Sequence, residues 1–320
     1  MIDRQMRITY APSATKALLM LAAVLLVPFM LMGQTSQRFT SLELALENPE
    51  KVQWLDLVCD DITSVSDYVM SLPNLESLYL TGCDLEELPK GIGQAGRLGL
   101  LNVQDNHLSH LPTELKDLQL LTVVNLRNNN FEEVPQVLSR LSNLREIDLS
   151  GNEQLDLDQA FTTLSKVEKL DFLYLAGLDM AKVPAKVKGL TRLEELHLSD
   201  NPGMDLAATF SSLAAVINLK ILVLTGNQVR SIPGEMTLLT QLKGLVLDDN
   251  PALEVEILAE HVKKMPSLEV LLLRNCRLTM LPENLEGLSG LAVLELSNNS
   301  FSEPEKARIK SLLPNTNVVF

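Results

Sequence analysis

Leu219–Gln241 reads LKILVLTGNQVRSIPGEMTLLTQ, and its pattern, LxxLxLxxNxVxxIPxxMxxLxx, decides the fold. The phrase LxxLxLxxN/CxL recurs with small departures along most of the chain. Its copies begin at Leu75, Leu98, Leu121, Leu144, Leu170, Leu193, Leu219, Leu242, Leu268 and Leu291, and a degenerate first copy begins at Val52. A pattern that returns at a fixed spacing indicates a repeat architecture, in which each copy is one structural unit.

Within each copy, the Leu-x-Leu core alternates as a short β-strand does. In the quoted stretch we expect Leu222 and Leu224 to point into the molecule, and Ile221 and Val223 to point out of the sheet. The Asn that follows, Asn227, should turn inward and bond backbone groups that would otherwise be buried without partners. One copy cannot bury its own apolar edges, so stacked copies must share one core.

The repeated phrase resembles the leucine-rich repeat, and the resemblance covers Val52 to Phe301. The 23-residue copies with Leu-Pro after the Asn resemble the typical class, and the lead-in to the first copy resembles that of secreted bacterial members. The resemblance implies an α/β solenoid, a horseshoe with a parallel concave sheet of about eleven strands. It also implies a protein that binds other molecules without catalysing a reaction. Leu178 departs from the pattern because it stands where Asn is expected, so we expect the Asn ladder to break there.

Two repeat lengths alternate in the second half of the chain. From Leu144 the copies pair, and Leu144, Leu193, Leu242 and Leu291 are each 49 residues apart. Short copies carry a proline after the Asn, which favours an extended, irregular return. The long copies instead contain apolar residues at helical spacing after an acidic start, which predicts true helices. We therefore expect a convex side that mixes irregular and helical segments.

The first 33 residues resemble a targeting segment. Arg4, Arg7 and Lys16 precede the apolar run Ala17–Met32, which would span roughly 24 Å as a helix, short of a hydrocarbon core of about 30 Å. The sequence predicts a signal peptide over residues 1–33, cleaved near Gly33-Gln34, with an uncleaved N-terminal anchor as the alternative. We therefore expect a secreted, periplasmic or cell-surface protein.

Each end of a solenoid needs a cover for its open core. Residues 34–51 are expected to form a helical N-terminal cap, in which Thr40 and Glu43 fit a capping box and Asn48-Pro49 ends the helix. The repeats occupy residues 52–301. Residues 302–320 are expected to form a second cap, with a helix that begins at Ser302 and a final TNVVF that adds an edge strand or covers the last repeat.

The chain is acidic, with a formal net charge of −14 over 320 residues. An acidic body disfavours nucleic acid and anionic membrane surfaces and favours basic partners, although charge also serves solubility. We therefore expect a protein partner, no nucleic acid, and membrane contact only through an uncleaved N-terminal segment.

Reactive residues are few. Cys83 and Cys276 occupy the Asn position of their repeats and should be buried and inert, and a Cys59–Cys83 disulfide is disfavoured because the two side chains should point differently. His107 and His110 lie near Asp105, but no further ligand supports a metal site. We find no phosphate loop, no nucleophile elbow and no paired carboxylates on a rigid cleft. The sequence predicts no catalytic residue, no metal and no cofactor.

The outward strand positions are the remaining candidate site. They form two neighbouring patches on the expected inner wall. The first mixes acidic, basic and aromatic side chains: Asn125, Arg127, Glu146, Asp148, Phe172, Tyr174, Glu195 and His197. The second is apolar: Ile221, Val223, Val246, Val270, Leu272 and Val293. Exposed aromatic residues beside charges favour a binding hot spot, and a contiguous apolar patch favours a contact surface, although β-branched residues also suit strands for their own sake.

The sequence therefore predicts a non-enzymatic protein-binding module that recognises its partner through the concave sheet. The alternative is a self-associating surface or adhesion component that uses the apolar wall or the ends of the sheet.

Overall fold

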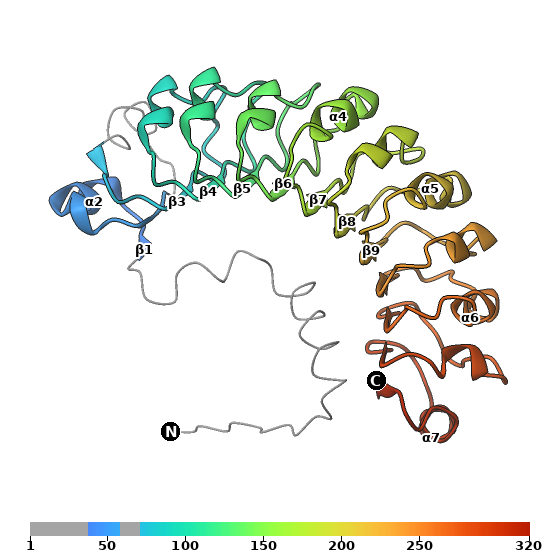
Figure 1. The fold of residues 1–320 in the computed structure, drawn as a ribbon. Helices are drawn as coiled ribbons and strands as arrows, with labels where there is room; N and C mark the ends of the chain where they lie inside the picture. The colour runs from blue at the N-terminus through green and yellow to red at the C-terminus, as the bar shows by residue number, and fades with distance from the viewer. Residues whose placement is uncertain (1–37, 58–70) are drawn as a thin grey trace, which may run out of the picture.

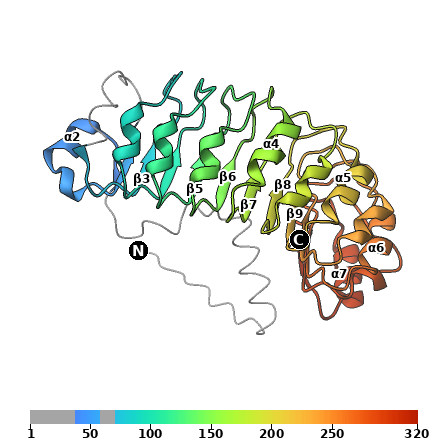
Figure 2. The same cartoon turned by 45° about the horizontal axis from the view of Figure 1, so that its top comes forward.

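The computed structural model describes residues 38–57 and 71–320. These residues form a horseshoe in which one parallel sheet lines the inner side and the helices lie outside (Figures 1 and 2). Strand order in the sheet follows the order of the chain without exception. The leucine-rich repeat architecture expected from the sequence is therefore confirmed.

The sheet has 13 strands within the described residues, two more than the repeats supply. The extra strands, β1 and β13, come from the two caps. The strands are β1 Arg38–Phe39, β2 Trp54–Asp56, β3 Ser77–Tyr79, β4 Leu100–Asn102, β5 Val123–Asn125, β6 Glu146–Asp148, β7 Phe172–Tyr174, β8 Glu195–His197, β9 Ile221–Val223, β10 Gly244–Val246, β11 Val270–Leu272, β12 Val293–Glu295 and β13 Asn317–Val319.

The middle residue of every strand from β2 to β12 points into the solenoid. Leu222, for example, pairs in register with Leu196 and Leu245, and the side chains of all eleven middle residues are 0% exposed. Strands at about 4.8 Å spacing bring these side chains into contact across repeat boundaries, so the repeats share a single core. The outward direction expected for the flanking residues follows from the alternation along each strand.

The convex side alternates between helices and tighter turns, as the two repeat lengths predict. The long repeats contain α4 Leu157–Leu164, α5 Leu206–Leu213 and α6 Val255–Val262. The short repeats contain 3₁₀ turns: η4 Lys90–Gln94, η5 Thr113–Asp117, η6 Gln136–Arg140, η7 Ala185–Gly189, η8 Gly234–Leu238 and η9 Glu286–Leu288. All but η9 of these turns begin directly after the proline, so the return is a regular 3₁₀ turn where the sequence analysis expected an irregular segment.

Inward-facing asparagines bond the backbone of neighbouring repeats. Asn201 shows the full arrangement: its Oδ1 accepts from the amides of Leu178 and Met180, and its Nδ2 donates to the carbonyl oxygens of Leu175 and Leu198, all at 3.0–3.1 Å. These partners are buried, so water cannot replace the side chain.

The side chain of Leu178 forms no hydrogen bond in this ladder, although its amide bonds Asn201, and the repeat geometry continues through it. In the preceding long repeat, the amide of Leu155 bonds the carbonyl of Asn152, at 3.0 Å, without help from the next repeat. Nδ2 of Asn152 also bonds the carbonyl of Leu149, at 2.8 Å. A ladder residue that follows a long repeat therefore has fewer groups to satisfy, and a leucine is tolerated there.

The residue directly before each ladder position has a positive φ, from +50° to +70°, in all ten repeats from the second onward. This column contains only three residue types: Gly82, Asp105, Asn128, Gly151, Gly177, Asp200, Gly226, Asp249, Asn275 and Asn298. Glycine, asparagine and aspartate tolerate this left-handed conformation best. At Gly151, an added Cβ would also lie 2.0 Å from Oδ1 of Asn128, so the side chains of this column also restrict one another.

Both ends of the sheet are covered. The N-terminal helix is α2 Leu42–Glu47, followed by the 3₁₀ turn η2 Pro49–Lys51, and its N-cap is Ser41, one residue after the Thr40 that the sequence analysis chose. At the other end, α7 Glu303–Leu312 begins after the N-cap Ser302, and β13 pairs with β12. Among the described residues, no helix is both long and apolar enough to cross a membrane.

Leu222→Ala should lower the free energy of unfolding by roughly 2–5 kcal/mol, because it opens a cavity in the shared core. Denaturant unfolding measures this loss. Leu238→Ala is the matched control, since that side chain belongs to the same repeat and is 51% exposed. Equal stability of the two variants would contradict the register described here.

Asn201→Leu should lower the free energy of unfolding by at least about 3 kcal/mol, because it leaves several buried backbone groups without partners at about 1–3 kcal/mol each. Leu178→Asn is the comparison, since it returns an asparagine to a position where the chain already manages without one. Thermal and denaturant unfolding of both variants would test whether the demand on the ladder differs between the two positions.

Candidate functional site

The outward residues of the strands form straight columns on the concave sheet. Glu146 pairs with Phe172 and Phe172 with Glu195 across β6, β7 and β8. Asp148, Tyr174 and His197 form the neighbouring column in the same way. The structure therefore brings the residues of the first predicted patch together, and we call these six residues the acid–aromatic patch.

Hydrogen bonds and stacking hold the acid–aromatic patch in one arrangement. The ring of His197 stacks on that of Tyr174, with centroids 4.2 Å apart and planes 26° apart. Nε2 of His197 lies 2.5 Å from Oε1 of Glu195, and the hydroxyl of Tyr174 donates to Glu146. Each glutamate thus has one partner from the aromatic column.

Burial changes the electrostatics of the patch. It raises the pKa of Glu146 to about 8, with further contributions from the negative charges of Glu195 and Asp148. The pKa of Asp148 is also raised by burial, although hydrogen bonds from Ser150 oppose the change. Burial and the same carboxylates raise the pKa of Tyr174, so its hydroxyl remains a donor. At neutral pH, therefore, Glu146 is largely protonated in the folded protein.

A glutamate close enough to raise the pKa of Glu146 was not expected from the sequence. Glu146 and Glu195 lie two strands apart, with Phe172 between them, and both side chains are buried. The sequence analysis found no paired carboxylates because it did not consider strands that are not neighbours. Each of the two already has a hydrogen-bond partner on an open sheet, which suits recognition of a charged or polar group.

The patch is less exposed than the sequence analysis assumed. Asp148, Phe172, Tyr174 and His197 are half-buried, and Arg127 beside them is exposed. Asn125 is buried: its Nδ2 donates to Oε1 of Gln104 and its Oδ1 accepts from the amide of Arg127, both at 2.9 Å. The accessible side chains are therefore those of Phe172, Tyr174, His197, Asp148 and Arg127.

The second predicted patch is buried. Its six members form an apolar cluster on β9 to β12 that is separate from the core of the solenoid: Ile221, Val223, Val246, Val270, Leu272 and Val293. Their side chains are only 1–9% exposed. The expectation of an exposed apolar wall was therefore wrong, because these side chains are almost completely buried.

A second aromatic pair lies at the N-terminal end of the concave sheet. The rings of Trp54 and Tyr79, on β2 and β3, are 5.7 Å apart, and the guanidinium of Arg38 lies 5.7 Å from the Trp54 ring. Arg38 also pairs with Asp56. Neither ring belongs to the two patches that the sequence analysis chose.

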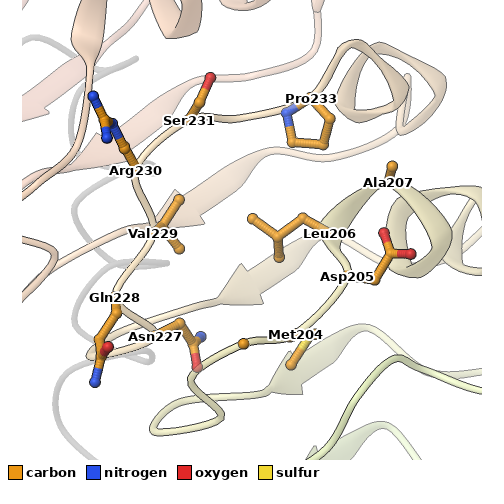
Figure 3. Close-up of a pocket in the computed structure, with 11 residues that line it drawn as sticks. Met204, Asp205, Leu206, Ala207, Asn227, Gln228, Val229, Arg230, Ser231 and Pro233 are labelled. Carbon is orange, nitrogen blue, oxygen red and sulfur yellow. The ribbon is translucent and has the colours of Figure 1, made fainter.

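A groove of about 410 Å³ lies where the chain leaves β8 and β9 (Figure 3). Met204, Leu206, Val229 and Pro233 give it apolar walls, and Arg230 lies at one side. Gly203 and Ala207 also line it. The corresponding residues of the other two long repeats are larger at most positions, namely Gln154 and Asp158, and Ala252 and Glu256. Small residues thus leave this groove open.

The two described cysteines differ. Cys276 is a free, buried thiol, and burial raises its pKa to about 11, so it is inert as expected. Cys83 is buried, but it is disulfide-bonded, which corrects the expectation of an inert thiol at that position. Cys59 lies outside the described residues.

The histidine pair on the turn after β4 does not form a metal site. Nε2 of His107 lies 3.6 Å from Oδ1 of Asp84, and His110 bonds only its neighbour Ser109, at 3.4 Å. Within residues 38–57 and 71–320, no group of three or more His, Cys, Asp or Glu side chains is arranged to hold a metal ion.

Comparisons with known proteins agree with this architecture. Models of the leucine-rich repeat family match residues 96–153, and again residues 74–95 and 267–288. No curated protein matches the chain in sequence.

Three solved structures are similar to this chain. TLR13, in a complex with the RNA ssRNA13, is 22% identical with a TM-score of 0.61, over 84% of this chain and 39% of its own. An internalin (inlF) from Listeria monocytogenes is 20% identical with a TM-score of 0.50, over 85% of this chain and 88% of its own. A leucine-rich repeat protein of Leptospira interrogans is 22% identical over 89% of this chain and all of its own, with a TM-score of 0.35.

Identities this low show the fold and nothing about a ligand. The family matches, the repeated phrase and the single parallel sheet together identify the chain as a leucine-rich repeat protein.

Proposed function

We propose that this chain is a non-enzymatic protein-binding module that recognises its partner through the acid–aromatic patch. Leucine-rich repeat proteins in general mediate protein–protein interactions. The observation that carries the proposal is the stacked, hydrogen-bonded arrangement of Tyr174, His197 and the two glutamates on β6 to β8. Side chains already fixed in one conformation lose little entropy when a partner arrives.

The partner is a protein segment that presents a basic or hydrogen-bonding side chain. Three carboxyl groups, Glu146, Asp148 and Glu195, lie within two strands of one another, and Arg127 is the basic side chain beside them. Tyrosine and other aromatic residues commonly dominate binding energy at interfaces, and Phe172 and Tyr174, both half-buried on β7, provide such anchors. The buried apolar wall takes no part in the proposal.

Exclusion of nucleic acid remains a prediction. It rests on the negative net charge alone, and the RNA complex of TLR13 shows that another protein of this fold can bind RNA. We therefore include single-stranded RNA as a competitor in the binding experiment described below.

We further propose that the protein works outside the cytoplasm, as a secreted or envelope protein. The basic and apolar character of residues 1–33, which lie outside the described residues, supports this proposal. The disulfide of Cys83 supports it independently, because disulfides persist in oxidising compartments. Mass spectrometry of the native protein would distinguish a cleaved signal peptide, with Gln34 at the N-terminus, from a retained anchor.

Replacement of both patch aromatics, Phe172→Ala with Tyr174→Ala, should weaken partner binding at least about tenfold, since each anchor contributes on the order of 1–2 kcal/mol. A protein captured from the native envelope fraction with wild-type bait is purified and titrated against both forms by calorimetry, with and without competing RNA.

Trp54→Ala with Tyr79→Ala is the matched control, because it removes the other concave aromatic pair. Loss of binding only in the control would move the site to β2 and β3. Equal affinity of all three forms would rule out both aromatic pairs as anchors.

Glu146→Gln should make stability less dependent on pH. The folded pKa, about 8, lies above the usual value of 4.5, so the stability that the protonated form contributes is fully present below about pH 4.5 and is lost as pH rises through 8. Glutamine keeps the neutral form at every pH. The melting temperature of the variant should therefore exceed that of the wild type by an amount that grows between pH 5 and pH 9.

Glu132→Gln serves as the control for this series, since Glu132 is an exposed residue in the segment that follows β5. If wild type and Glu146→Gln show parallel pH profiles, Glu146 titrates as an ordinary surface carboxylate.

A further inference from the structure

The two flat sides of the horseshoe carry opposite charge. In a parallel sheet all chains enter the strands at one edge and leave at the other, so the segments before the strands form one side and the segments after them form the opposite side. We call them the leading flank and the trailing flank. We compare them over the nine repeats that begin at Leu98, Leu121, Leu144, Leu170, Leu193, Leu219, Leu242, Leu268 and Leu291.

The leading flank is basic. We define it as the seven residues that run from five before to one after the first leucine of each repeat. It holds twelve Lys and Arg against six Asp and Glu, a surplus of six positive charges, and ten of the twelve basic side chains are exposed. A chain whose formal net charge is −14 thus presents one positively charged side.

The trailing flank is acidic. It is the seven residues from six to twelve after the same leucines. It holds five Lys and Arg against twelve Asp and Glu, a surplus of seven negative charges, and ten of the twelve acidic side chains are exposed. The opposing charges of the two flanks therefore nearly balance.

The leading flank neutralises only part of its positive charge: Lys220, Lys243 and Lys263 pair with Glu194, Glu269 and Glu286, but the basic residues outnumber the acidic ones two to one. Arg145 and Arg192 share the single buried carboxylate of Asp171, at 2.5 Å and 3.2 Å, so two guanidinium groups answer one negative charge. Nζ of Lys169 bonds the neutral side chain of Asn143, at 2.7 Å. Positive charge thus remains available to a partner on this flank.

Each flank also carries an apolar feature at the same level of the solenoid. Ile217 precedes the repeat that begins at Leu219, lies on the leading flank and is 73% exposed. The groove of Figure 3 lies on the trailing flank, between that repeat and the one before it. Its walls, Met204, Leu206, Val229 and Pro233, suit a branched aliphatic side chain. An exposed isoleucine and an open apolar groove therefore lie on opposite sides of the same pair of repeats.

A second copy of the same chain fits both flanks. Two identical horseshoes stacked flat side to flat side have the same curvature, and a straight stack sets the leading flank of each repeat on the trailing flank of the same repeat in the next copy. It also sets Ile217 opposite the groove. Such a contact joins two different surfaces, so it extends without closing.

We propose that copies of this chain stack flank on flank, with the basic leading flank of one on the acidic trailing flank of the next and Ile217 seated in the neighbour's groove. The concave sheet stays open in this arrangement, so the inference does not depend on the acid–aromatic patch. Charge sets the orientation of the copies, and the apolar contact sets their register.

Sedimentation velocity on the full chain tests the proposal over a range of concentrations and salt. The average mass should rise above that of one chain, 35.4 kDa, as concentration increases, and return toward it at high salt. Two charge-reversal variants locate the contact. The leading-flank variant carries Lys166→Glu, Lys169→Glu and Lys188→Glu, and the trailing-flank variant carries Glu132→Lys, Glu133→Lys and Glu153→Lys.

Each reversal variant alone should stay monomeric, because its changed flank then carries almost no net charge: nine basic against nine acidic residues on the leading flank, or eight against nine on the trailing flank. An equimolar mixture should form pairs, because the unchanged basic flank of the trailing-flank variant is complementary to the unchanged acidic flank of the leading-flank variant. Residues 1–33 are identical in all forms, so association through that segment would survive both reversals and would contradict the proposal. Circular dichroism confirms that each variant is folded; the chosen lysines avoid Arg145 and Arg192, which hold the buried Asp171.

Two single changes test the groove. Ile217→Ser should abolish assembly, whereas Ile257→Ser, which removes a 43% exposed isoleucine from the convex helix α6, outside both flanks, should not. Ala207→Glu places a larger side chain in the groove, the one that the repeat beginning at Leu242 has at this position, Glu256. The change also adds a negative charge beside the acidic flank. If charge alone drove association, this variant should associate more tightly. If Ile217 must enter the groove, the variant should no longer associate.

A wild-type chain that stays monomeric at low salt up to high concentration would overturn the proposal. A second result would also overturn it. If wild type bound phosphatidylglycerol–phosphatidylcholine vesicles, the leading-flank variant did not, and neither form self-associated, the basic flank would serve a lipid surface.

Discussion

Backbone groups at the end of each strand would be buried without partners if inward-facing amide side chains did not bond them. Asn201 satisfies groups in two repeats at once, and an unsatisfied group in such a place costs about 1–3 kcal/mol. The leucine core supplies cohesion but tolerates small shifts between repeats. The asparagine hydrogen bonds do not tolerate such shifts, because their geometry fixes the position of each repeat relative to the next. Straight columns on the concave sheet, and hence any site made from several strands, depend on that constraint.

The fold could be predicted from the sequence because its two periodicities are local. The alternation in Leu-x-Leu predicted the register of Glu146, Phe172 and Glu195 correctly, and the long repeats predicted the helices α4 to α6. The strand β1 and the N-cap Ser41 were missed, because two or three residues outside the repeat carry too little pattern. The positive φ before each ladder residue could have been predicted but was not, because only Gly, Asp and Asn occur at that position of the repeat.

Less of the candidate site could be predicted, because burial and coupling are properties of assembled strands. Periodicity shows that Val246 and Leu272 point out of the sheet, but it cannot show that they are only 1–3% exposed. Glu146 and Glu195 are 49 residues apart in sequence, and Glu195 raises the pKa of Glu146 only because their strands lie on either side of β7. The disulfide of Cys83 was disfavoured from expected side-chain directions, which hold for regular repeats.

The relief that a long repeat gives to the ladder position after it has an evolutionary consequence. Three such positions lie 49 residues apart, and they hold three different residues: Leu178, Asn227 and Cys276. Sensitivity to substitution should then rise and fall along the gene with a period of two repeats, even though the structural repeat is one. Drift accumulates where the backbone already satisfies itself. New side chains can enter the interior of the solenoid at those sites while the intervening asparagines remain fixed.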